Sequence, residues 1–109
     1  MRPDNFSNNS ESLCIEDLAL TKICEEIPTP FYIYSQASIE AAATSYLKNA
    51  SDSDLICYSV KANSNINLLK ILAQLGMGFD VVSVGELKRA LKAGATANKI
   101  VFSGVGKSK

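Results

Sequence analysis

One lysine stands where a strand-like run of the sequence gives way to residues that favour a helix start. Residues 55–60 are mostly apolar and β-prone, Lys61 follows them directly, and polar residues continue from Asn63. A lysine at the end of a buried strand can lose hydration and become a neutral amine, the form that attacks a carbonyl to give a Schiff base. The same pattern also fits an ordinary solvated lysine at a strand end, so the rest of the sequence has to distinguish the two interpretations.

The composition argues against several other kinds of site in this chain. The 109 residues contain no histidine, so this chain offers neither histidine acid–base catalysis nor histidine metal ligands. Cys14, Cys24 and Cys57 lack a Cys-x-x-Cys spacing, which predicts reduced thiols and neither a zinc site nor a disulfide framework. A net charge of zero gives nucleic-acid binding no electrostatic support.

Membrane and secretion signals are also missing from the pattern. No apolar run reaches the length of a membrane span. The polar first residues lack the apolar core of a secretory signal, so we expect a cytoplasmic protein.

The first third of the chain predicts little regular structure before one strand. Its Asn- and Ser-rich residues 1–12 predict disorder. Loosely helical apolar spacing over residues 15–27 predicts a short amphipathic helix, which the prolines at 28 and 30 end. Residues 31–34, with two tyrosines, a phenylalanine and an isoleucine, predict a strand.

A longer helix is predicted next, followed by the strand that leads to the lysine. Ser35 or Ser38 can cap this helix, and its spacing places five residues on one apolar face: Ile39, Ala42, Ala43, Tyr46 and Leu47. The strand over residues 55–60 does not alternate between polar and apolar, so we expect it to be buried on both faces, as in a parallel sheet.

Two more helix–strand pairs complete the pattern. A helix from about Asn65 has an inward face of Leu68, Leu72 and Leu75 and ends at Gly76. A strand at 79–82 leads to Ser83-Val84-Gly85-Glu86, a capping-box pattern that opens a helix with Leu87, Ala90 and Leu91 inward and a stop at Gly94. Residues 100–102 predict a last strand.

Such a βα series predicts parallel pairing with right-handed crossovers. The fold class is therefore α/β. A (β/α)₈ barrel takes about 250 residues, so we interpret residues 13–109 as the N-terminal part of a TIM barrel that is incomplete in this chain.

Four blocks of the sequence, in order, resemble the diaminopimelate decarboxylases, which belong to the fold-type III pyridoxal-phosphate enzymes. They are residues 29–34, 56–65, 78–83 with 85–87, and 99–107. The second block resembles the cofactor-lysine motif of the whole fold-type III group, and the last block narrows the resemblance to this family. Ser59 stands where alanine is usual and Val84 where glycine is common, which affects local geometry near the site.

The resemblance implies pyridoxal 5'-phosphate as cofactor and Lys61 as the Schiff-base lysine, buried at the carboxyl end of the barrel. Asp80 matches an acidic residue beside this lysine and would help to orient it; the alternative is a strand-edge aspartate bonded to backbone. Glu86 matches a second acid near the cofactor, but its place in the capping box explains it equally well. No metal site is implied.

The implied activity is the decarboxylation of meso-diaminopimelate to L-lysine by a homodimer that takes a small amino-acid substrate and has no nucleic-acid or membrane partner. The family's phosphate loop, ring-stacking histidine and dimer-supplied cysteine are expected beyond Lys109, so we expect the 109 residues alone to be inactive. Three alternatives stay open: another fold-type III decarboxylase acting on ornithine, arginine or a carboxylated polyamine, a non-catalytic cofactor carrier or decoy subunit, and a decayed remnant without function.

Overall fold

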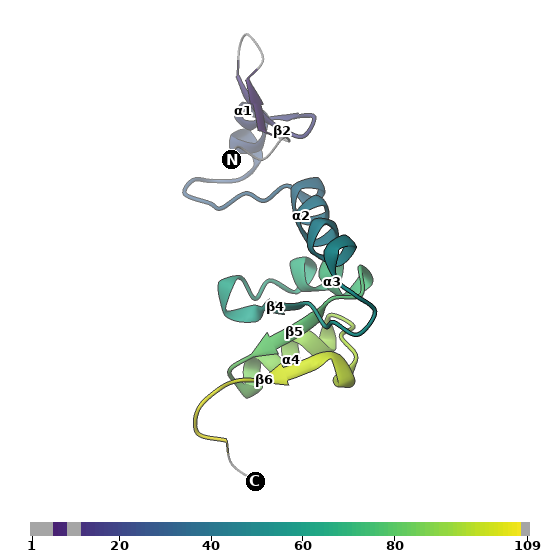
Figure 1. Ribbon diagram of the computed structural model, residues 1–109. Coiled ribbons are helices and arrows are strands. Elements are labelled where there is room, and N and C mark those ends of the chain that lie inside the picture. The colour runs from purple at the N-terminus through teal and green to yellow at the C-terminus, as the bar shows by residue number, and fades with distance from the viewer. Residues whose placement is uncertain (1–5, 9–11, 108–109) are drawn as a thin grey trace. The chain divides into compact units, whose positions relative to one another are not determined.

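The computed structural model describes residues 6–8 and 12–107, which belong to two compact units, Met1–Ala41 and Ala42–Lys109 (Figure 1). The first unit holds a small antiparallel sheet and a short helix. The second holds a parallel sheet with its connecting helices. Each unit is described by itself below.

The sheet of the first unit has the order β1–β2–β3. Strand β1 (Phe6–Asn8) pairs with β2 (Leu13–Ile15), and β2 pairs with β3 (Leu18–Ala19). Helix α1 (Leu20–Glu26) follows β3 directly. Glu16 forms the turn between β2 and β3 with a φ of 51°, in the left-handed region.

Two expectations for this unit are wrong. The helix predicted over residues 15–27 is confined to α1, because the left-handed backbone at Glu16 makes a turn where a helix would have to continue. Residues 31–34 are not a strand. Phe31 and Ile33 are half-buried and Tyr32 and Tyr34 exposed, as in extended backbone, but no strand pairs with them among the described residues.

The disorder predicted for residues 1–12 can be compared with the structure only in part. Phe6–Asn8 is ordered as β1, because antiparallel pairing with β2 satisfies its backbone groups. Residues 1–5 and 9–11 lie outside the described residues.

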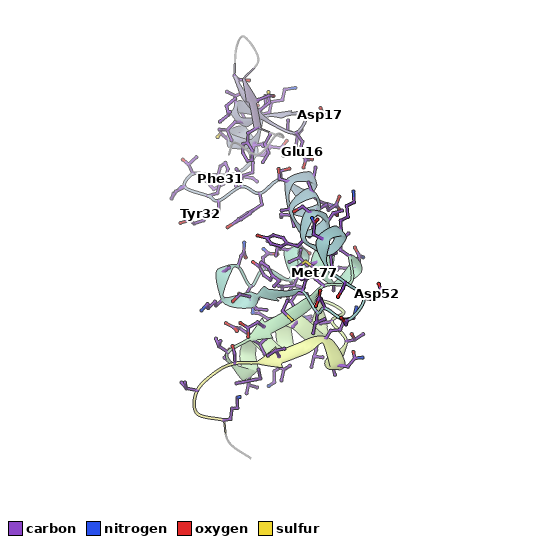
Figure 2. The ribbon with its side chains drawn as sticks, in the orientation of Figure 1. Glu16, Asp17, Phe31, Tyr32, Asp52 and Met77 are labelled. Carbon is purple, nitrogen blue, oxygen red and sulfur yellow. The ribbon has the colours of Figure 1, made fainter. Side chains whose placement is uncertain are left out.

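Glu16 also fixes the start of the next helix, α2 (Gln36–Asn49). Its side chain, labelled in Figure 2, accepts at Oε1 a hydrogen bond from the hydroxyl of Ser35 at 2.7 Å and one from the backbone N–H of Ala37 at 3.0 Å. The hydroxyl of Ser35 in turn accepts from the N–H of Ser38 at 3.1 Å, so Ser35 is the cap of the two candidates. These hydrogen bonds, that of Ser35 first, lower the pKa of Glu16 below its ordinary value.

Helix α2 begins in the first unit and ends in the second. The predicted apolar face is correct at Ala43, which is buried, and at Ile39 and Leu47, which are half-buried. It is wrong at Ala42 and at Tyr46, whose side chain is 66% exposed.

The second unit is built on a parallel sheet of order β4–β5–β6, as the βα series predicts (Figure 1). The strands are β4 (Cys57–Ser59), β5 (Gly78–Val81) and β6 (Ile100–Phe102). Their register places Ser59 beside Asp80, and Asp80 beside Val101. The α/β fold class is therefore confirmed, and the strands end at one common edge.

Helices α3 (Ile66–Gln74) and α4 (Val84–Lys92) pack against each other, and α4 packs against β5. The largest fully buried side chains of this unit are Val60, Leu69, Phe79 and Val81. Within β5, Phe79 and Val81 thus lie on the packed face and Asp80 on the other, since side chains alternate along a strand.

The predicted helix faces and ends are mostly correct here. Leu68 and Leu72 are buried on α3, although the sequence did not single out Leu69, the most buried residue of that helix. Leu91, predicted to point inward on α4, is 46% exposed. Gly76 and Gly94 follow the two helices with φ of 87° and 100°, the left-handed stops that were predicted.

Candidate functional site

Lys61 is the middle residue of the single 3₁₀ turn Val60–Ala62, which follows β4 directly. Val60 is fully buried and anchors this turn to the core, whereas Lys61 is exposed. The burial expected for this lysine at the carboxyl end of a complete barrel stays a prediction. The expected two-sided burial of its strand is wrong, because β4 is only half-buried and helices cover one face of the sheet.

Asp80 lies on the uncovered face of the neighbouring strand, at the same end of the sheet. It pairs in register with Ser59, two residues before Lys61. Its Oδ1 accepts a hydrogen bond from the hydroxyl of Ser103, which follows β6. Asp80 is therefore held by a side chain. The alternative interpretation, an aspartate bonded to backbone, does not match this contact.

Ser103 is a hydrogen-bond partner of Asp80 that the sequence analysis missed. It is the first residue past β6, and residues just beyond the carboxyl ends of parallel strands are where ligands bind in α/β proteins. That positional rule, applied to all three strands, would have identified it. Lys61, Asp80 and Ser103 therefore come from the carboxyl ends of three adjacent parallel strands.

The pKa of the Cys57 thiol in β4 depends in part on the charge of Asp80 in the neighbouring strand. Partial burial raises the pKa of the Cys57 thiol, and the negative charge of Asp80 raises it further. The carboxylate of Asp80 thus acts on neighbouring groups of β4 across the sheet.

Glu86 forms two hydrogen bonds at the start of α4. The hydroxyl of Ser83 accepts from the N–H of Glu86 at 3.1 Å, which is the first half of the predicted capping box. The carboxylate of Glu86 reaches one residue further back than expected and accepts from the N–H of Val82 at 2.7 Å. Val82 follows β5 directly, so Glu86 ties the end of that strand to the helix start.

The loop between Lys61 and α3 is held by polar contacts. The side-chain oxygen of Asn63 accepts from the N–H of Asn65 at 3.0 Å, and Asn65 caps α3 by accepting from the N–H of Asn67 at 2.9 Å. Asn63 therefore orients the turn after Lys61. The hydroxyl of Tyr58 donates to the carbonyl of Asn63 at 3.2 Å.

The part of the chain that the structure describes has neither a group of three or more potential metal-ligating side chains nor a helix long and apolar enough to cross a membrane.

Residues 36–109 match the family described as the pyridoxal binding domain of pyridoxal-dependent decarboxylases. The chain belongs to this family. The family assignment made from the sequence is confirmed, and with it the pyridoxal-derived cofactor on which the family depends.

Individual relatives support this family assignment. The diaminopimelate decarboxylase of Pseudomonas aeruginosa is 50% identical over 107 residues, which cover 97% of this chain and 26% of that protein. That of Campylobacter jejuni is 56% identical over 87 residues, covering 78% and 21% respectively. The chain therefore spans about a quarter of the length of such relatives.

Solved structures show the same fold. The diaminopimelate decarboxylase from M. jannaschii superimposes with a TM-score of 0.82 at 30% identity, covering 97% of this chain and 26% of that one. The Helicobacter pylori enzyme complexed with L-lysine has a TM-score of 0.71 at 47% identity and covers 81% of this chain and 23% of that one.

Proposed function

We propose that this chain provides the first strands of the pyridoxal-phosphate barrel of a diaminopimelate decarboxylase, an enzyme that converts meso-diaminopimelate to L-lysine. The observation that carries the proposal is the placement of an exposed lysine, a carboxylate and a hydroxyl at the carboxyl ends of three adjacent parallel strands. Identities of about 50% to diaminopimelate decarboxylases support this substrate. Among the solved structures, the Helicobacter pylori diaminopimelate decarboxylase is 47% identical, whereas a lysine and an ornithine decarboxylase are 26% and 29% identical and the M. jannaschii diaminopimelate decarboxylase is 30% identical.

The donor set fits the cofactor. An accessible amine can bond covalently to an aldehyde, and Lys61 offers one on a turn that is anchored by Val60. Asp80 offers a fixed carboxylate at the same edge, which would orient the lysine and the cofactor through hydrogen bonding and charge. When bound, pyridoxal phosphate supplies the electron sink that makes the loss of CO₂ possible.

The residues of this chain then have distinct roles. Lys61 would hold the cofactor covalently through its side-chain amine. Asp80 would place a carboxylate beside that amine, and Ser103 fixes the direction of this carboxylate. Glu86 fixes the junction between β5 and α4, and any role toward the cofactor is in addition to that. The proposal includes a (β/α)₈ barrel, a homodimer and a cytoplasmic location for the assembled protein, with no nucleic-acid or membrane partner.

The test uses a hybrid protein, in which this chain replaces the matching segment of the Pseudomonas aeruginosa enzyme. We expect the hybrid to release CO₂ from meso-diaminopimelate and to leave ornithine and arginine unchanged. A Lys61→Ala hybrid is the matched control and should be inactive. A well-folded hybrid that binds the cofactor but does not decarboxylate meso-diaminopimelate would contradict the proposed activity.

A further inference from the structure

The turn that carries Lys61 has little intrinsic stability. It is a single 3₁₀ turn, and such turns are short because their hydrogen-bond geometry is poor. Ser59, at its N-cap position, makes no side-chain capping bond. Buried Val60 anchors the side of the turn that leads in from β4. On the side that leads out to α3, the side-chain oxygen of Asn63 accepts from the N–H of Asn65 at 3.0 Å, and further contacts come from other elements.

Two side chains from different elements contact the backbone on that outgoing side. The hydroxyl of Tyr58, in β4, donates to the carbonyl oxygen of Asn63 at 3.2 Å. The guanidinium Nη1 of Arg89, in α4, donates to the carbonyl oxygen of Ser64 at 3.3 Å. The two acceptors are consecutive carbonyls, two and three residues beyond Lys61. Donors from the strand and from the neighbouring helix thus hold the outgoing backbone at two adjacent points.

We propose that Tyr58 and Arg89 are positioning residues that clamp the turn carrying Lys61. They fix where the lysine backbone leaves the sheet while its side chain stays exposed. Reactive groups act efficiently only when their supports hold them within fractions of an ångström. The proposal rests on the proposed function in one respect, since it takes Lys61 to be the residue that bonds to the cofactor.

The first test measures the loop in the 109-residue chain without any cofactor. Amide hydrogen exchange at Asn65, whose N–H is bonded to Asn63, reports opening of the loop. A net hydrogen bond is lost in Tyr58→Phe and in Arg89→Met, so exchange at Asn65 should be about three- to tenfold faster in each. Tyr32→Phe is the control, because the Tyr32 side chain is 93% exposed, and it should change nothing.

A second amide separates a loosened loop from a loosened protein. The N–H of Gly78 donates to the carbonyl of Ile56 at 2.8 Å within the sheet. The clamp predicts unchanged exchange at Gly78 in both variants. Equal acceleration at Gly78 and Asn65, or no acceleration at Asn65, would overturn it.

The second test measures the lysine in the hybrid protein. Borohydride trapping of pyridoxal phosphate should fall at least about threefold at Lys61 in Tyr58→Phe and Arg89→Met, and trapping at exposed Lys70 should not change. Arg89→Lys keeps a cationic donor and should restore part of the loss. Unchanged trapping at Lys61 in both variants would refute the positioning role. Absence of trapping at Lys61 before any substitution would instead refute the proposed function, and the exchange measurement would still decide whether the clamp exists.

Discussion

Replacing Gly78 by alanine should destabilise the second unit because there is no room for a methyl group on its backbone. An ideal Cβ at this position would lie 2.6 Å from the carbonyl oxygen of Lys99 and 2.8 Å from Sγ of Cys57. Carbon–oxygen contacts are normally about 3.3 Å or longer. The Lys99 oxygen belongs to backbone directly before β6, so relief requires β5 and β6 to move apart by roughly 0.7 Å.

The magnitude follows from two opposing terms. Overpacking in a well-packed region costs about 1–3 kcal/mol, and the upper part of that range applies because the obstacle is backbone. Alanine also reduces the freedom of the unfolded chain, which offsets about 0.4–1 kcal/mol. The free energy of unfolding should therefore fall by about 1–2.5 kcal/mol.

Gly85→Ala is the matched control. Gly85 lies in α4, and the nearest atom to a Cβ there is Oγ of Ser83 at 3.8 Å, an ordinary contact. Only the unfolded-state term remains, so this variant should be unchanged or more stable by up to about 1 kcal/mol. Urea unfolding of both variants, followed by far-ultraviolet circular dichroism, measures the difference. If Gly78→Ala unfolds at the same urea concentration as Gly85→Ala, the packing argument is wrong.

Three further outcomes are expected. Asp80→Asn removes a negative charge that raises the pKa of Cys57, so the Cys57 thiol should react faster with a disulfide reagent in this variant. Exposed Cys24 is the internal control and should keep its rate. Equal Cys57 rates in the variant and the unchanged protein would contradict the electrostatic coupling. Because the pKa of Glu16 is lowered in the folded chain, its contribution to stability is complete above the pKa of an unfolded glutamate, about 4.3, and is lost as pH falls through the lower folded value. Protection of the Ala37 amide from hydrogen exchange should therefore decline as the solution is acidified. A Glu16→Gln variant should lack this pH dependence. In the hybrid protein, Asp80→Ala should reduce turnover well beyond threefold, and a smaller loss, under roughly 0.7 kcal/mol of barrier, would favour a purely structural aspartate.

Local signals in the sequence predicted the second unit well. Helix caps and stops depend on one or two residues and their own backbone, so Ser83, Gly76 and Gly94 could be assigned from residue type alone. The parallel order of β4, β5 and β6 followed from short βα connections, which permit few other topologies.

The errors concern features that depend on distant partners. Residues 31–34 have the composition and the alternating exposure of a strand, but pairing needs a second strand, which their composition cannot supply. The turn at Glu16 is stabilised by Ser35 and Ala37, about twenty residues away, so the pattern over residues 15–27 gave no sign of it.

The candidate site shows the same division. Lys61 and Asp80 could be named because family motifs contain them. Ser103 and the clamp residues Tyr58 and Arg89 were missed because their roles are set by a contact to another strand or to a loop carbonyl. The exposure of Lys61 could not be predicted either, since burial depends on what covers the open face of the sheet.

The most direct test of the account is the identity of the lysine that bonds to the cofactor. The hybrid protein is incubated with pyridoxal phosphate, reduced with borohydride and digested, and the modified peptide is located by mass spectrometry. The account predicts modification at Lys61, on the turn that follows β4. Modification at Lys70 or Lys99 in its place would contradict it.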